Sequence, residues 1–256
     1  MTYRKSIGSV NFTVAPLEDA VKLILDLPTQ IQSQGHPGIS VHFANAYNVA
    51  LGRRNPEYAQ VLNAADYVFS DGVPITWVGK RAYPDLAHAW ERVYGPDVMR
   101  MVMERSQLTA PRHYLLGSTP DVLKALRQNI EANYPQALIV GSDSPAFHES
   151  LASELSERDE RITSSGATMV WVGLGTPKQD YEVRRLASTL PVVALAVGAA
   201  FDFLAGTKTQ APRWMQRNGL EWAYRFGREP KRLAKRYLWG NSVFGIEAAQ
   251  TLRRSR

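Results

Sequence analysis

Residues 168–197 read TMVWVGLGTPKQDYEVRRLASTLPVVALAV, and this stretch decides the fold class. Its first apolar run, 168–172, ends in a glycine-containing loop, and a helical pattern then extends from Pro177 to Leu190. A second apolar run follows at 192–197. Two strands joined through a helix lie parallel, and strands that are apolar along their whole length are covered on both faces. The stretch therefore predicts a β-α-β unit of a parallel α/β sheet.

The same alternation continues toward the N-terminus. Further strands are predicted at 39–43, 67–70, 113–116 and 137–140, and helices at 17–25, 56–64, 96–105, 120–133 and 148–158. Regular alternation of this kind is typical of an α/β sheet flanked by helices. After about Gly206 the alternation stops and the remainder reads as helix, so we expect an α/β core at 1–208 and a helical appendage at 209–256.

The amino-acid composition excludes several classes of protein. Its 256 residues are 45% hydrophobic, which is enough for one substantial core. The chain has no cysteine, which excludes disulfides and thiolate metal sites. No run of about 18 apolar residues is present, and the start lacks the apolar run of a signal peptide. We therefore expect a soluble, unsecreted chain.

The net charge of +6 is concentrated in the tail. Residues 213–256 hold eleven Lys/Arg and three Glu. Aromatic and leucine side chains interleave with the basic residues Arg228, Lys231, Arg232, Lys235 and Arg236. This mixture suits anionic lipid head groups. It also suits a nucleic-acid backbone, or a helix that packs its apolar side on the core and solvates its charges.

The motifs of several common enzyme classes are missing. GLGTPK at 173–178 has two glycines of a dinucleotide fingerprint, but Lys178 stands where the third glycine belongs. The chain contains no P-loop, no His-Glu-x-x-His and no Gly-x-Ser-x-Gly. It also lacks an Asp-x-Asp, with which many sugar transferases hold a divalent ion. A nucleotide diphosphate would therefore be met by amides and basic side chains.

Three strand-to-helix junctions begin with glycine, at Gly117, Gly141 and Gly173. Such junctions lie at the carboxyl ends of parallel strands, where ligands of open α/β sheets bind. Glycine lets a ligand approach the backbone, and the following helix N-terminus offers free amides to phosphate. Each junction taken alone is also compatible with a simple tight turn.

Several stretches, in this order and spacing, resemble the WecG/TagA/CpsF family, glycosyltransferase family 26. They are FANAYN (43–48), AADYVFSDGVP (64–74), ERVYGPDVM (91–99), VGLGTPKQD (172–180), VGAAFDFLAG (197–206), APRW (211–214), GLEWAYRF (219–226) and EPKR (229–232). The resemblance implies a Rossmann-like, mainly parallel sheet. It also implies inversion at the sugar carbon, a UDP-activated donor, a polyprenyl-diphosphate-linked acceptor and no catalytic metal or other cofactor.

Roles carry over from the family's motifs residue by residue. Asp71 stands at the aspartate of the Asp-Gly motif, which implies the general base that takes a proton from the acceptor hydroxyl. Arg92 matches an arginine of the family pocket, where a cation can steady the departing diphosphate. Gln179 matches the amide of Pro-Lys-Gln, so these three residues are the predicted catalytic set.

The remaining predicted contacts bind the donor or acceptor. Asn45 matches an asparagine of the family, although Phe43 stands where the family has threonine. Asp202 matches the aspartate associated with nucleotide binding, and residues 141–147 replace a loop that more often reads His-Gly-Tyr-Phe. The predicted binding residues are Asn45, Gly72, Gly117, Ser118, Phe147, Lys178, Gly198 and Asp202.

The resemblance thus predicts a hexosyltransferase at the cytoplasmic face of the plasma membrane. It would move N-acetylmannosamine, its uronic acid or glucose from UDP to a lipid-linked saccharide in bacterial cell-surface polysaccharide synthesis. The appendage would associate with the anionic membrane surface and close over the active site, and no nucleic acid is expected as a partner. Two alternatives stay open: a nucleotide-sugar-binding module without catalysis, and a basic nucleic-acid-binding protein. The sequence does not indicate the oligomeric state.

Overall fold

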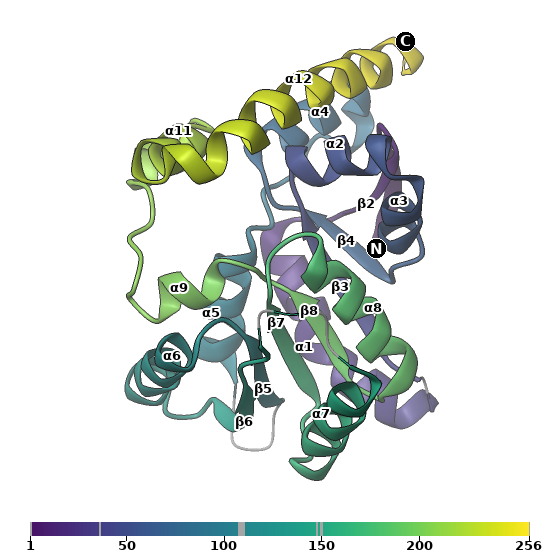
Figure 1. Cartoon of the computed structure of the whole chain (residues 1–256). Helices are drawn as coiled ribbons and strands as arrows, with labels where there is room; N and C mark the ends of the chain where they lie inside the picture. The colour runs from purple at the N-terminus through teal and green to yellow at the C-terminus, as the bar shows by residue number, and fades with distance from the viewer. Residues whose placement is uncertain (1, 36, 107–110, 147, 149–150, 256) are drawn as a thin grey trace. The chain divides into compact units, whose positions relative to one another are not determined.

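The computed structural model describes residues 2–35, 37–106, 111–146, 148 and 151–255 (Figure 1). Contacts between α-carbons divide the chain into two compact units. The first unit comprises residues 1–20, 43–94 and 210–256, and the second comprises 21–42 and 95–209. Residues 213–254 are mainly helical, as predicted for the C-terminal segment, and they belong to the first unit.

Six strands form the main sheet, in the order β4-β3-β8-β7-β5-β6. They are β3 (Ile39–Ala44), β4 (Tyr67–Ser70), β5 (Arg112–Gly117), β6 (Leu138–Asp143), β7 (Met169–Gly173) and β8 (Val193–Ala196). The β-α-β unit quoted from the sequence is present, because β7 pairs in parallel with β8 and helix α8 (Lys178–Thr189) connects them. β5 also pairs in parallel with β6 and with β7. The prediction of a Rossmann-like α/β fold is confirmed.

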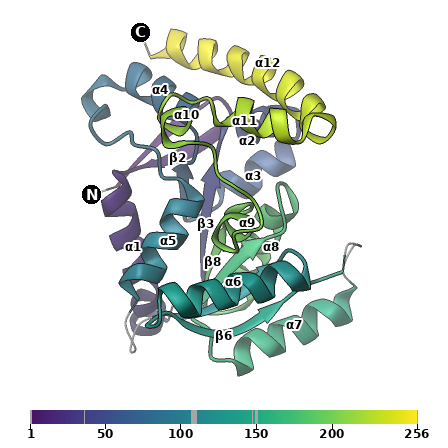
Figure 2. The same cartoon turned by 90° about the vertical axis from the view of Figure 1, so that its left-hand side faces the viewer.

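The second unit wraps helices around β5 to β8. Its other helices are most of α1 (Leu17–Gln34), then α5 (Gly95–Arg105), α6 (Pro120–Asn133), α7 (Ala152–Ser164) and α9 (Ala200–Leu204). α8 turns Val183 and Leu186 onto Val170 and Ala194, which are fully buried strand residues. Figure 2 shows α6 and α7 on either side of β6, which is the edge strand of the sheet.

The first unit contains a hairpin that was not predicted. β1 (Tyr3–Ile7) pairs antiparallel with β2 (Val10–Val14), and Gly8 takes a positive φ of 58° in the turn. The unit's helices are α2 (Ala46–Arg54), α3 (Pro56–Asn63), α4 (Val73–Ala82), the short 3-10 helix η1 (Pro84–Leu86), α10 (Arg213–Arg217), α11 (Glu221–Arg228) and α12 (Pro230–Arg254). α12 contacts both α2 and α4 (Figure 1).

The structure has α2 and α4, which were not predicted, and α1 extends to Gln34 instead of residue 25. Two further boundaries differ from the prediction for local physical reasons. α7 begins at Ala152 instead of 148, because the Glu154 carboxylate accepts from the Leu151 N–H at 2.8 Å and caps the helix there. β6 continues to Asp143 and so includes Gly141, which was predicted to follow the strand. A Cβ at Gly141 would come within 2.4 Å of the Tyr114 ring on β5, so only glycine permits this pairing.

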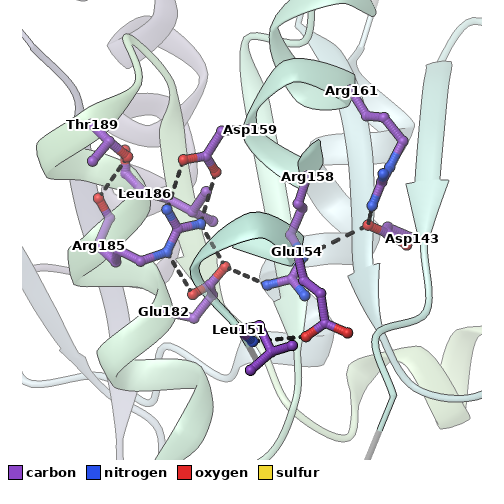
Figure 3. Close-up of polar contacts among 10 residues, drawn as sticks. All are labelled: Asp143, Leu151, Glu154, Arg158, Asp159, Arg161, Glu182, Arg185, Leu186 and Thr189. Carbon is purple, nitrogen blue, oxygen red and sulfur yellow. Dashed lines mark hydrogen bonds and ion pairs between the residues drawn. The ribbon is translucent and has the colours of Figure 1, made fainter. Parts of the chain in front are cut away.

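A charge network joins α7, α8 and the end of β6 (Figure 3). Arg185 donates two bonds to Asp159, at 2.7 and 2.8 Å, and two bonds to Glu182, both at 2.9 Å. Arg158 donates to the same Glu182 at 3.1 Å and lies 3.6 Å from Asp143. Because the Arg158 side chain is only 5% exposed, its two carboxylate partners offset a large desolvation cost.

Arg158 and Arg161 form a matched pair for testing this network, because both lie on α7 and both contact Asp143. We expect Arg158→Met to lower the free energy of unfolding by about 3 kcal/mol, since it leaves Glu182 largely buried without one of its cations. Arg161 is 51% exposed, so Arg161→Met should cost less than about 1 kcal/mol. Denaturant unfolding of both variants measures the difference. An equal decrease in the free energy of unfolding would show that burial does not determine how much these ion pairs stabilise the protein.

Candidate active site

The predicted base, Asp71, lies directly after the carboxyl end of β4. Its backbone N–H donates to the carbonyl of Ala44, at the end of β3, at 2.9 Å. The side chain is half-buried, and the next residue, Gly72, is the N-cap of α4. A Cβ at Gly72 would lie 3.4 Å from the Cβ of Asn45, so the ends of the two strands bring Asp71, Gly72 and Asn45 together.

Arg92 is fixed beside Asp71 by main-chain and side-chain contacts. The Val93 N–H donates to the carbonyl of Ser70 at 2.8 Å, which ties this segment to the end of β4. Arg92 Nε then donates to the main-chain carbonyl of Asp71 at 2.8 Å. Burial opposes the charge of Arg92, but the carboxylates of Asp71 and Glu221 outweigh it and raise the pKa of Arg92 above its ordinary value. Arg92 therefore stays cationic next to the predicted base.

Asn45 has a structural role that its motif did not reveal. Its side-chain oxygen accepts from the Tyr47 N–H at 3.0 Å, and the Asn48 side chain accepts from the Asn45 N–H at the same distance. The two residues form a capping box at the start of α2. The contact that the sequence predicts between Asn45 and substrate remains a prediction.

In the second unit, two residues with positive φ, Gly117 and Ser118, form the start of the β5–α6 junction. Gly117 has a φ of 124°, and a Cβ there would lie 2.6 Å from the backbone of Gly173 on β7. Ser118 has a φ of 61°, which is unusual for a residue with a side chain. Its carbonyl accepts from the Ser144 hydroxyl at 2.7 Å, which helps to hold it in place. Close packing and this hydrogen bond therefore hold the junction backbone in an unusual conformation at the carboxyl end of β5.

Gln179 is 5% exposed, and its amide is already bonded to the protein. Its oxygen accepts from the Gly175 N–H at 3.1 Å, and its nitrogen lies 3.5 Å from the carbonyl of Ala196. Gly198, with a φ of 55°, lies against the same amide. Gln179 thus joins the β7–α8 loop to the end of β8, a positioning role that the sequence alone did not indicate.

The last predicted binding residues differ in their surroundings. Lys178 is exposed at the first position of α8. Asp202, on α9, forms an ion pair with Lys208 at 3.3 Å. Phe147 lies outside the described residues. Among the described residues, no three His, Asp or Glu side chains gather in a way that could hold a metal ion, and the absence of a catalytic metal stays a prediction.

Residues 5–256 match the family model described as glycosyl transferase WecG/TagA/CpsF family. The chain belongs to this family. The match covers nearly the whole chain and confirms the resemblance seen in the sequence. Membership in the WecG/TagA/CpsF family supports a glycosyltransferase role in cell-surface polysaccharide synthesis.

In this WecG/TagA/CpsF chain, the predicted membrane residues lie on α11 and α12. Arg228 is exposed, and its guanidinium lies over the Tyr224 ring, 5.4 Å from the centroid. Lys231 is also exposed. The side chains of Arg232, Lys235 and Arg236 lie outside what the structure describes. Within the described residues, no helix is both long enough and apolar enough to cross a bilayer.

Glu221 also belongs to this site, although the sequence predicted no role for it. Glu221, the first residue of α11, accepts from Arg92 at 2.5 Å and from the Tyr94 hydroxyl at 2.7 Å. Its place in GLEW at 219–222 marks it as part of the family pattern, but no local periodicity predicts a partner 129 residues away.

Proposed function

We propose that the chain is an inverting glycosyltransferase that uses a UDP-sugar and needs no metal. Its acceptor would be a saccharide carried on a polyprenyl diphosphate at the inner face of the plasma membrane. The observation that carries this proposal is the position of Asp71, a half-buried carboxylate at the end of β4 with a cation beside it.

An inverting transfer needs one carboxylate and a stabilised leaving group. Asp71 would take the proton from the acceptor hydroxyl while the hydroxyl oxygen attacks the sugar carbon. The bond from that carbon to the diphosphate breaks in the same step, and the electron pair leaves with UDP. Arg92 and the amides that begin helices would stabilise the charge that develops on the diphosphate. Family membership supports the glycosyltransferase activity to which these proposed roles belong.

Side chains on the C-terminal helices support a role at a membrane surface. Trp214 is 60% exposed and Leu238 is 74% exposed, while Trp222 and Phe226 are also exposed on α11. Basic residues accompany them, including Arg228 and Lys231. Exposed aromatic and basic side chains together favour anionic lipid head groups, each basic residue contributing roughly 1 kcal/mol near the surface.

A donor screen tests the proposal. UDP-N-acetylmannosamine, its uronic acid and UDP-glucose are each supplied with a polyprenyl-diphosphate-linked saccharide in anionic vesicles, and UDP release is followed. We expect one donor to react with acceptor-dependent UDP release, EDTA to leave the rate unchanged, and NMR of the product to show the inverted anomer. Neutral vesicles should give a lower rate, because they lose the attraction to the basic residues.

Three outcomes would count against the proposal. Loss of the rate in EDTA would argue for a metal, and a retained anomer would argue for a second nucleophile. Tight donor binding without turnover for any of these donors would favour a binding module without catalysis.

A further inference from the structure

Glu221 is the centre of a polar cluster that lies wholly within the first unit. One carboxylate oxygen accepts from Arg92 at 2.5 Å. The other accepts from the Tyr94 hydroxyl at 2.7 Å and lies 2.5 Å from Arg225 Nη2. The Glu221 side chain is 14% exposed, so its contacts are largely shielded from water. A single carboxylate therefore holds two guanidinium groups.

The same cluster leads directly to the predicted base. Arg92 donates to the main-chain carbonyl of Asp71, and its guanidinium stacks on the Tyr94 ring with 3.8 Å to the centroid. Arg225 also donates to the Tyr94 hydroxyl at 3.0 Å. Because Glu221 begins α11, these bonds connect the C-terminal segment to the end of β4 through the Arg92 side chain.

The charges of the cluster fit an anion that binds beside it. Two arginines face one glutamate, which leaves one unit of positive charge before Asp71 is counted. Burial would raise the pKa of Glu221, but Arg225 and Arg92 outweigh it and lower that pKa below its ordinary value, so Glu221 remains a carboxylate at neutral pH. Arg92 Nε is bonded to the main-chain carbonyl of Asp71 and its Nη2 to Glu221, so two sides of this guanidinium are fixed by the protein.

We propose that Glu221 is a positioning residue that holds Arg92 and Arg225 in place for the departing diphosphate, an inference that rests on the proposed function. Arginine is a long side chain with several rotatable bonds, so an arginine that must meet charge in the transition state benefits from being held beforehand. One carboxylate oxygen of Glu221 binds Arg92, and the other binds Arg225. The Tyr94 ring stacks on Arg92, and the Tyr94 hydroxyl accepts from Arg225.

Two substitutions separate position from charge at Glu221. Glu221→Gln keeps the shape of the side chain and removes the charge, whereas Glu221→Asp keeps the charge and withdraws the carboxylate by one methylene. If both the charge and the exact position of the Glu221 carboxylate are needed to hold the two arginines, both variants should lower kcat by roughly 10- to 100-fold. KM for the donor should change less than about threefold. Tyr94→Phe, which removes a single hydroxyl, should lower kcat by about three- to tenfold. Glu57→Gln, on the exposed first turn of α3, is the matched control and should leave both constants unchanged.

The measurement is steady-state UDP release, together with the thermal midpoint of each variant. A wild-type rate for Glu221→Asp with a reduced rate for Glu221→Gln would overturn positioning in favour of simple charge balance. A faster Glu221→Gln would overturn it in favour of Glu221 competing with the diphosphate. If the glutamate variants fail to fold, a wild-type kcat for Tyr94→Phe overturns the inference. If the wild-type protein releases no UDP, the proposed function itself is wrong. If the wild-type protein is active and the variants match it, only this inference is wrong.

Discussion

Replacing Asp71 by asparagine should lower kcat for transfer by about 10²- to 10⁴-fold, the contribution expected of a positioned general base. Asparagine has nearly the same shape, and the bond from Arg92 is to the main-chain carbonyl, so the local structure should persist. The loss should therefore appear in kcat, while KM for the UDP-sugar stays within a few-fold of wild type.

Asp66→Asn is the matched control for this substitution. Asp66 is exposed just before the start of β4, whereas Asp71 is half-buried just after its end. We expect the control to retain wild-type turnover and both proteins to unfold at similar temperatures. Undiminished UDP release by the Asp71→Asn protein would mean that another group accepts the proton.

The stability of the protein should fall steeply in acid because of His113. This residue is fully buried on β5, where Nδ1 accepts from Trp171 Nε1 at 3.1 Å and Nε2 lies 2.9 Å from the Ser106 hydroxyl. That hydroxyl in turn donates to the carbonyl of Val102 at 2.8 Å. The chain of bonds suits a neutral ring protonated at Nε2, and burial lowers the pKa of His113 from 6.5 to about 3.

The sign of the pH dependence follows from which state binds more protons. Between pH 6.5 and 3 the unfolded chain protonates His113 and the folded chain does not, so stability falls as the pH falls through this window. Above pH 6.5 the contribution is fully present. A difference of about 3.5 pKa units corresponds to about 5 kcal/mol across the whole window, of which about 3 kcal/mol is lost by pH 4.

His113→Gln isolates this contribution from those of other groups. The variant should be less stable than wild type at pH 7.5, and the gap between the two free energies of unfolding should shrink by about 3 kcal/mol on reaching pH 4. Urea unfolding at a series of pH values measures the gap. A gap for His113→Gln that stays constant between pH 7.5 and pH 4 would contradict the prediction.

The parallel α/β fold could be predicted because its signals are local. Apolar runs bounded by glycine or proline place β4 at the predicted residues and α6 at the predicted bounds. The hairpin of β1 and β2 was missed, because five-residue strands of mixed character carry little periodicity. The position of Asp71 at a strand end also followed from the sequence, since the strand and the Asp-Gly that follows are adjacent in the chain.

What the sequence determined by itself is the fold class, the family and the position of Asp71 after a strand, because each depends on neighbouring residues or on motif order. Only the tertiary structure decided which side chains meet: Glu221 with Arg92, Gln179 with the end of β8, and His113 with Trp171. The physical reason is that such partners stand far apart in the chain, and their hydrogen bonds form only after the sheet and helices have packed.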